Sequence, residues 1–403
     1  MNSSQLRVGA ENHQKTGTQY RKRGRTTSLL VAMALTLAAC SSGTGSNASD
    51  PGSPSGEGGS AVKLDEAKAI VEEGMQVPEF VAPEPAVDVP ALAGKSIFLV
   101  PLSSEVPFDQ AILESMTAIA DEANIDLTIF PTRGQPADWL RGVTQATTMR
   151  PDLLILLGAP DPDTLGPQLT EAQNAGIPVL VTHHYPIGVE LPEYVTAHVP
   201  GPFLDAARLE VAYAIANSGG EANMVVVSAD EYFVSSHIYE EMLATRDELC
   251  PECQMKKVNV PIPEWADKIQ GEVQSALIAD PSVNWVITMY DGMASFAQAA
   301  IISAGRTGQV QIATFNGTPS ALKMVQDGDI VAMDVGENPD WLAHANMDQA
   351  FRILAGMETS EDVKTPVRIF DKSNIDETGT PPQLGQGYGT DYTDGYRKVW
   401  GLE

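Results

Sequence analysis

Apolar runs of strand length alternate with helical patterns over most of the chain between residues 95 and 334. In the first part, apolar runs at 96–101, 125–130, 152–157 and 178–182 are separated by helical patterns at 109–124, 137–149 and 165–175. Strands of continuous apolar character indicate a parallel sheet covered on both faces, and the helices between them supply the crossovers. The pattern predicts an α/β fold built of βαβ units.

The same alternation then begins again. Helical patterns at 201–218, 235–249, 266–279, 294–304 and 320–327 are interleaved with strand patterns at 223–228, 257–260, 285–289, 311–315 and 330–334. Two successive series predict two doubly wound parallel-sheet lobes. Ligands bind outside the carboxyl ends of the strands in such sheets, so two facing lobes can line one cleft.

The first 40 residues read as an export signal. A basic stretch, Arg21 to Arg25, leads into an apolar run at 29–39 that ends in Leu-Ala-Ala before Cys40. This run is too short for a permanent anchor, because a bilayer-spanning helix needs about 20 apolar residues. A cysteine after Leu-Ala-Ala resembles the bacterial lipobox, in which the thiol receives a diacylglycerol. We expect a signal peptide at 1–39 and lipidation of Cys40; an ordinary signal peptide beside an unmodified cysteine is the alternative.

Two segments separate Cys40 from the folded body. Residues 40–60 are rich in Gly, Ser and Pro and are typical of a flexible tether. Residues 61–94 contain one helical pattern, at 61–74, and then a proline-rich linker. The arrangement predicts an extracytoplasmic body anchored by lipid to the outer face of the cell membrane, in a periplasm or at the cell surface.

The charge balance excludes some partners. The chain has 53 acidic and 25 basic residues, and the part from Cys40 onward has 52 acidic against 19 basic residues. Nucleic acid is therefore not an expected partner, because phosphate backbones are held by Lys and Arg clusters. An anionic ligand would need a local group of basic residues to offset the negative potential of the chain. With 43% hydrophobic residues, the body can form two ordinary domains.

Cys250 and Cys253 are the remaining cysteines. A close pair outside the cytoplasm is normally a disulfide. The pair follows a helical pattern, whereas a redox-active CxxC belongs at a helix N-terminus, where the thiol pKa is lowered. Zinc would need four ligands, and there is no second pair. We expect a structural Cys250–Cys253 disulfide, with redox activity as the alternative.

Several short motifs appear in the order and spacing of one known family. They are Pro107-Phe108 (compare NPFF), 175–179 AGIPV, 290–294 YDGMA (compare NDxMA), 315–319 FNGTP (compare FDGTP) and 337–339 ENP (compare QNP). In these motifs the chain resembles the type I periplasmic sugar-binding proteins, the ribose-binding-protein-like receptors of ABC importers. The resemblance covers roughly residues 95–370.

The resemblance implies capture of a solute by closure of two lobes joined by a multi-strand hinge, and delivery to an ABC permease. It implies a first lobe of residues 95–199 plus 337–366, a second lobe of 200–336 plus 367–403 with the C-terminal tail, and a monomer without cofactor. An enzyme is not expected, since the chain has no GxSxG, Walker A or HExxH motif. The carboxylates of Asp109, Asp291 and Glu337 keep a carbohydrate-active hydrolase open as an alternative.

The motifs also place the expected ligand contacts, several of which depart from the family pattern. His183-His184 stand where the family often has Asp-Arg, and His237 stands near the position of a second pocket arginine. We expect no catalytic or metal-binding residue. The predicted ligand-binding residues are Ser103, Ser104, Phe108, Asp109, His183, His184, His237, Trp265, Tyr290, Asp291, Asn316 and Glu337.

These residue types suit a neutral hydroxylated ligand. The aromatic faces of Phe108 and Trp265 can pack against the C–H surface of a ring. Carboxylates, amides and imidazoles can hydrogen-bond hydroxyl groups. We predict a small sugar or polyol, with a cyclic alcohol, a nucleoside or a furanose signal as alternatives. A core position for Phe108, a surface position for Trp265 and a polar loop at 183–184 also remain open, and a metal would require the histidines to converge.

Overall fold

The computed structural model describes residues 62–158, 161–328, 330–360 and 363–403. The expected signal peptide (1–39), the lipidation site Cys40 and the tether (40–60) lie outside the described residues. Among the residues that are described, no helix has the length and apolar character needed to cross a membrane.

The first sheet has five parallel strands in the order β2-β1-β3-β4-β5. Its strands are β1 (Ser96–Pro101), β2 (Asp126–Ile129), β3 (Leu153–Leu157), β4 (Val179–Thr182) and β5 (Ala197–Val199). Its helices are α2 (Pro107–Glu122), α3 (Pro136–Met149), α4 (Gly166–Asn174) and α10 (Pro339–Leu354). This sheet and its helices form the first lobe.

The second sheet has six strands in the order β11-β10-β9-β8-β6-β7. Its strands are β6 (Asn223–Ser228), β7 (Gln254–Asn259), β8 (Trp285–Thr288), β9 (Gln311–Asn316), β10 (Val331–Glu337) and β11 (Val367–Asp371). Only β11 runs antiparallel, against β10. The other five strands repeat the order of the first sheet, so the prediction of two doubly wound α/β lobes is confirmed.

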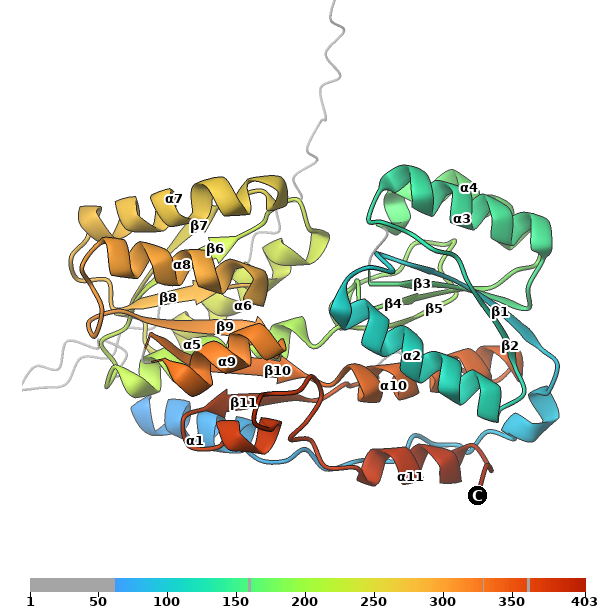
Figure 1. Cartoon of the computed structure of the whole chain (residues 1–403). Coiled ribbons are helices and arrows are strands. Elements are labelled where there is room, and N and C mark those ends of the chain that lie inside the picture. The colour runs from blue at the N-terminus through green and yellow to red at the C-terminus, as the bar shows by residue number, and fades with distance from the viewer. Residues whose placement is uncertain (1–61, 159–160, 329, 361–362) are drawn as a thin grey trace, which may run out of the picture. The chain divides into compact units, whose positions relative to one another are not determined.

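Helices cover both faces of the second sheet to form the second lobe (Figure 1). These helices are α1 (Leu64–Gly74), α5 (Phe203–Asn217), α6 (Phe233–Leu249), α7 (Trp265–Ala279), α8 (Asp291–Ser303) and α9 (Pro319–Asp327). The residues of β8 alternate between the two faces. Trp285 and Ile287 pack with α1, α5 and α6, whereas Val286 packs with α7, α8 and α9.

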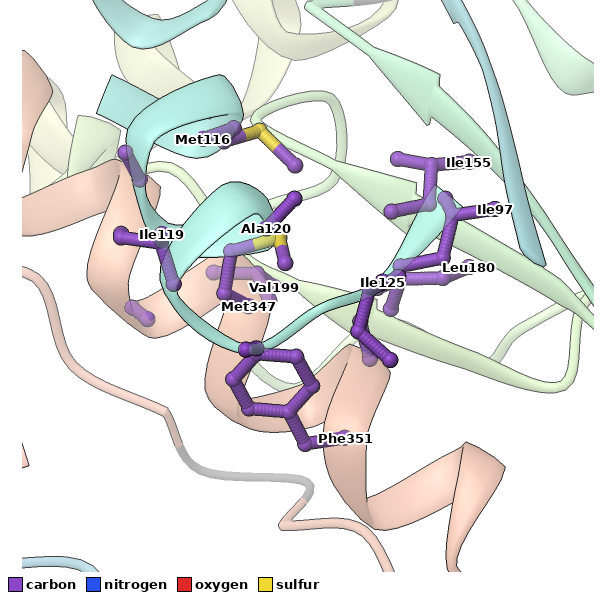
Figure 2. Close-up of a cluster of buried hydrophobic side chains, with 14 of the residues drawn as sticks. Ile97, Met116, Ile119, Ala120, Ile125, Ile155, Leu180, Val199, Met347 and Phe351 are labelled. Atoms are coloured by element: carbon purple, nitrogen blue, oxygen red, sulfur yellow. The ribbon is translucent and has the colours of Figure 1, made fainter. Parts of the chain in front are cut away.

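The first lobe is built in the same way. Phe98 and Val100 of β1 pack on the side of α3 and α4, whereas Ile97 and Leu99 pack on the side of α2 and α10. Figure 2 shows the first-lobe core on the side of α2 and α10, where Met116 of α2 lies with side chains of the strands and of α10. Burial of each large apolar side chain contributes up to about 1.5–3 kcal/mol. Because alternate residues of such a strand are buried on opposite faces of the sheet, its sequence is a continuous run of apolar residues.

The chain crosses between the lobes from β5 to α5, from β10 to α10 and from α10 to β11. At the second crossing, Asn338 caps α10, because its side-chain oxygen accepts from Asp340 N at 3.0 Å and Trp341 N at 3.2 Å. Pro339 occupies the first turn, where a missing N–H costs nothing. The helix therefore begins directly after the strand that ends at Glu337.

The two ends of the described chain differ from the expected division. Residues 367–371 join the second sheet as expected, but the C-terminal helix α11 (Asp391–Val399) packs into the first lobe. Its Tyr392 and Tyr396 rings lie in the core that contains Trp341 of α10. At the other end, α1 buries Val71 against the second lobe, and the proline-rich segment then buries Val89 in the first lobe.

Cys250 and Cys253 are joined by a disulfide in the structure. Cys250 is the residue at which α6 ends, and β7 begins directly after Cys253. Both cysteines are buried in the second-lobe core that contains α1, α5 and α6. The pair therefore closes a turn between a helix and a strand and is not at a helix N-terminus.

Candidate functional site

A cavity of about 270 Å³ lies between the two lobes. Its lining residues follow the carboxyl ends of strands in both sheets, such as Gly158 after β3, His183 after β4 and Tyr290 after β8. This is the edge at which doubly wound sheets bind ligands. We call this cavity the cleft.

Eight predicted contact residues line the cleft. They are Phe108, Asp109, His183, His184, Trp265, Tyr290, Asp291 and Asn316. The first four come from the first lobe and the last four from the second lobe. The sequence therefore predicted residues from both walls.

Four predicted contact residues do not line the cleft. Ser103 is buried and donates its backbone N–H to Asp109 Oδ2 at 3.0 Å. Ser104 Oγ accepts from Thr132 N at 3.2 Å. Glu337 lies behind the lining residues, bound to His183 and Asn316. His237 was predicted as a contact, but it lies on α6 one turn beyond Phe233 and packs against that ring at 4.9 Å between centroids.

Three aromatic lining residues were not predicted, namely Phe203, Tyr232 and Phe233. Tyr232-Phe233 follow β6 much as Pro107-Phe108 follow β1, so the repeated strand order was the signal that could have found them. Phe203 lies at the start of α5, just after the chain crosses from the first lobe. The remaining unpredicted lining residues are Leu102, Val106, Gly158, Val234, Gly292 and Thr318.

An ion pair links the two lobes at the base of the cleft. His183 Nε2 of the first lobe lies 2.8 Å from Glu337 Oε2, and Asn316 Nδ2 donates to Glu337 Oε1 at 3.0 Å. His183 has a φ of 54°, in the left-handed region. Such a backbone costs about 1–3 kcal/mol outside glycine and persists only where the surroundings hold it. The contact with Glu337 is one interaction that holds it.

Neighbouring carboxylates set the charge of His183. Burial alone would lower the pKa of His183, but the charges of Glu337 and Asp109 outweigh it, so the net pKa is raised. Burial raises the pKa of Asp109 to about 6, against the opposing effects of the Ser103 N–H and His183. Glu337 and Asp109 therefore both favour the protonated form of the His183 imidazole.

His184 behaves in the opposite way. Burial lowers the pKa of His184 to about 4, so its ring is neutral at physiological pH. Its Nε2 atom is buried and has no hydrogen-bond partner in the described part of the chain. The ring is stacked on Phe233 at 5.6 Å between centroids and an interplanar angle of 22°. His184 thus lines an aromatic part of the cleft with a neutral ring whose Nε2 atom is buried.

The carboxylate of Asp291 is already used within the second lobe. Oδ1 accepts from Thr314 Oγ1 at 3.0 Å, and Oδ2 accepts from Thr318 N at 2.7 Å and from Thr318 Oγ1 at 2.8 Å. Burial raises the pKa of Asp291 to about 7, although these hydrogen bonds oppose the shift. Asp291 therefore fixes the loop after β9 at the base of the cleft.

The residues that the structure describes include no group of three or more His, Cys, Asp or Glu side chains arranged to hold a metal ion. His183 and His184 both reach the cleft, but His237 does not. The three histidines therefore do not converge.

The comparison with known families matches residues 97–358 to the periplasmic binding protein domain. The chain belongs to this family. The resemblance seen in the short motifs is confirmed, and so is the expectation of a solute-binding protein rather than an enzyme. Periplasmic binding proteins of ABC importers act outside the cytoplasm.

Curated relatives are similar along most of their length. The ribose import binding protein RbsB of Escherichia coli (strain K12) is 26% identical over 298 residues, which are 72% of this chain and 94% of that protein. A xylitol-binding protein of Mycolicibacterium smegmatis (strain ATCC 700084 / mc(2)155) is 25% identical over 272 residues, covering 65% of this chain and 73% of that protein.

Solved structures share the fold. A periplasmic ribose ABC transporter protein from Conexibacter woesei DSM 14684 superposes with a TM-score of 0.64 at 20% identity, over 75% of this chain and 97% of that chain. An ABC transporter solute-binding protein from Agrobacterium vitis, solved with bound allitol, gives a TM-score of 0.62 at 19% identity, over 72% of this chain and 99% of that chain. The two-lobed architecture is thus common to these proteins.

Proposed function

We propose that this protein captures a small neutral sugar or polyol outside the cytoplasm by closure of its two lobes and delivers it to an ABC import permease. The protein acts as a monomer anchored by a lipid on Cys40. The observation that carries the proposal is the cleft, because both lobes supply lining residues at the carboxyl ends of their strands. A ligand that touches both walls stabilises the closed arrangement.

The chemistry of the cleft supports a neutral ligand. Asp109 and Asp291 line it, and among the described residues no Lys or Arg does. An anionic solute would meet two carboxyl groups, and His183, whose pKa is raised, is already paired with Glu337. The named ligands of the relatives, ribose and xylitol, are neutral and hydroxylated.

Binding is tested first by a thermal-shift screen of neutral sugars and polyols. A ligand that binds only the folded state raises stability by about 2.7 kcal/mol at a concentration of 100 times Kd. A protein that no sugar, polyol or sugar derivative stabilises would contradict the proposal.

The site itself is tested by calorimetry with the ligand found in that screen. Phe108→Ala removes an aromatic face from the first-lobe wall, and we expect affinity to fall by about tenfold or more. Phe296→Ala is the matched control, because Phe296 is a partly buried aromatic residue of α8 outside the cleft. Equal affinity of both folded variants and the wild type would place the ligand elsewhere.

The lipid anchor is tested separately. Cys40→Ser removes the thiol that would receive the diacylglycerol, so we expect the protein to move from the membrane fraction to the soluble fraction. A Ser41→Ala variant, changed at the adjacent residue, is expected to stay with the membrane. Retention of Cys40→Ser on the membrane would show that something other than this lipid holds the protein there.

A further inference from the structure

We propose that the cleft selects a neutral solute in which a hydroxylated, sugar-like part carries a flat aromatic ring, as in a nucleoside or an aryl glycoside. The inference rests on the proposed function and narrows its ligand class. The cleft, with a volume of about 270 Å³, is just below the range of roughly 300–1,000 Å³ that is usual for small-molecule pockets.

The second-lobe wall is a group of packed aromatic rings. Trp265 and Tyr290 are stacked, with centroids 6.4 Å apart and an interplanar angle of 20°. Tyr232 meets Tyr290 edge-on at 5.6 Å. All three residues line the cleft. Aromatic pairs in these geometries are favourable, so the wall is a pre-formed apolar surface.

Trp265 and Tyr290 already have hydrogen-bond partners within the protein. Trp265 Nε1 donates to the carbonyl oxygen of Val260 at 3.0 Å, and the Tyr290 hydroxyl lies 3.2 Å from Ser235 Oγ. What these side chains offer to a ligand is therefore mainly ring surface. Gly292 also lines the cleft, and a Cβ there would come within 2.8 Å of the Trp265 ring, so only glycine lets the indole lie this close to α8.

The opposite side of the cleft is aromatic too. The rings of Phe108 and His183 lie 5.5 Å apart, and His183 lies 4.9 Å from Phe203. At a further point of the lining, Phe233 stacks on His184. Phe233 is 38% exposed although it is large and apolar, so a ligand could still cover part of its ring.

The polar groups of the cleft leave few hydrogen-bonding positions for a bare polyol. Three hydrogen bonds occupy Asp291, and Asn316 Nδ2 and His183 Nε2 both bind Glu337. A ligand hydroxyl that is buried without a partner costs about 1–3 kcal/mol. A ligand with hydroxyl groups on every side would meet this penalty repeatedly, whereas a ligand with a flat apolar part would not.

At least one polar position remains for the hydroxylated part, at Asp109. Asp109 accepts from Ser103 with Oδ2, and its other oxygen lies on the side of Gly158, a lining residue. His184 Nε2 is 4.0 Å from Asp161 Oδ1, beyond hydrogen-bonding distance, and has no partner among the residues described. That nitrogen is buried, so His184 offers the ligand its stacked ring rather than a hydrogen bond. The cleft thus combines broad ring surface with a small number of polar contacts.

The test compares probes that differ only in the aromatic part, by calorimetry on the complete mature chain. One pair is ribose and adenosine, and the other is methyl and phenyl β-D-glucopyranoside. We expect the aromatic member to bind at least tenfold more tightly in at least one pair, with no preference for the non-aromatic member in the other. Phenyltrimethylammonium is included because an aromatic wall beside carboxylates could also attract a cation.

Variants at Trp265 test whether the second-lobe wall causes the preference for an aromatic ligand. Trp265→Ala is expected to weaken the aromatic probe at least tenfold, and Trp265→Phe, which keeps a ring, is expected to restore most of the loss. The Phe296→Ala control should bind within twofold of the wild type. The thermal midpoints of the unliganded variants show whether each is folded, and Trp265→Phe keeps the test informative if Trp265→Ala is not.

The outcomes separate this inference from the proposed function. Tighter binding of ribose or the methyl glycoside overturns the inference and leaves the proposed function intact. Binding of both members equally, or a Trp265→Ala variant with wild-type affinity for the aromatic probe, also overturns it. Tighter binding of phenyltrimethylammonium than of any neutral probe would contradict a neutral ligand. No binding by any neutral probe counts against the proposed function, and the inference would fall with it.

Discussion

Asp348 in the first lobe and Asp334 in the second are both almost completely buried, but only Asp348 has a cation beside it. Asp348 Oδ2 lies 2.7 Å from Arg352 Nε, and Asp348 Oδ1 accepts from Trp400 Nε1 at 3.0 Å. Asp334 has no ion pair among the described residues, and its carboxyl group is hydrogen-bonded to the Asp291 carboxyl group instead. The first lobe thus keeps a buried charge by pairing it.

Two buried carboxyl groups of the second lobe, those of Asp334 and Glu210, are instead kept neutral. Burial raises the pKa of Asp334 well above its ordinary value, and the nearby Asp291 and Glu210 raise it further, although the Gly317 N–H opposes the shift. Burial likewise raises the pKa of Glu210, which is 1% exposed and has an unpaired oxygen. A carboxyl group without a cation becomes protonated in the fold rather than bear the cost of a buried charge.

This difference matters at the cleft, because the neutral group lies directly behind it. Gly317 N donates to Asp334 Oδ1 at 3.1 Å, and the next residue, Thr318, holds Asp291. Thr318 and Asp291 line the cleft. Protonation of the second-lobe carboxyl groups is therefore part of what shapes the binding site, whereas the Asp348–Arg352 pair is a structural element of α10.

The largest effect is expected from breaking the paired charge. Arg352→Met keeps much of the side-chain volume but leaves the Asp348 carboxylate buried without its cation. Loss of one partner from a buried pair costs about 3–5 kcal/mol. Urea unfolding at neutral pH, monitored separately for the wild type and the variant, measures this loss.

A second substitution distinguishes the charge from the packing. In the Arg352→Met background, Asp348→Asn removes the charge that was left unpaired while the Trp400 N–H can still find an oxygen. We expect this double variant to recover part of the lost stability. A double variant that is no more stable than Arg352→Met would mean that packing, rather than the unpaired charge, causes the loss.

Asp334→Asn is expected to change the stability in the opposite direction, that is, to stabilise the protein. The pKa of Asp334 is raised in the fold, so its contribution to stability is fully present below the unfolded-state pKa and is lost as the pH rises through the folded-state pKa. Asn needs no proton and can still accept from Gly317. We expect the variant to be more stable than the wild type at about pH 8, by about 1 kcal/mol, and the difference to shrink toward about pH 4.

Thermal midpoints measured across this pH range test the sign. Glu210→Gln should show the same trend, since the pKa of Glu210 is raised by burial too. Asp126→Asn, at an exposed position at the start of β2, is the control and should show no such trend. A stability gain that is independent of pH, or that grows toward acid, would refute the neutral-carboxyl interpretation.

The sequence predicted the sheets well because most residues of their central strands are buried. The run at 153–157 is apolar throughout, and β3 has all five of these residues buried. Helix α10 was not predicted, and the reason is physical. It is buried on nearly all sides, and its buried residues include His344, Asn346 and Arg352, so neither an apolar stripe nor a polar face marks it.

The candidate site was predicted only in part, because the motifs name positions and not partners. Phe108 lines the cleft as its motif indicates, and so does Trp265, which was predicted from its aromatic side chain alone. The sequence does not show that Glu337 would bind His183 across the lobes, since 154 residues separate them. It also does not show that His237 would not line the cleft, because the rotation of α6 is set by how Ile238 and Met242 pack against the second-lobe core formed with α1 and α5.

The smallest effect is expected where charges are paired at the surface. Arg208 of α5 and Glu248 of α6 make two hydrogen bonds, of 2.7 and 3.2 Å, and their side chains are 32% and 39% exposed. Water screens such a pair, and exposed pairs contribute about 0.2–1 kcal/mol. A double-mutant cycle with Arg208→Met and Glu248→Gln should therefore give a coupling energy in this range, and salt at about 1 M should remove most of it. The same cycle on Arg352 and Asp348 should give a larger coupling that salt hardly changes, because no solvent reaches that pair. A surface coupling energy as large and as insensitive to salt as the buried one would mean that burial does not determine the strength of these ion pairs.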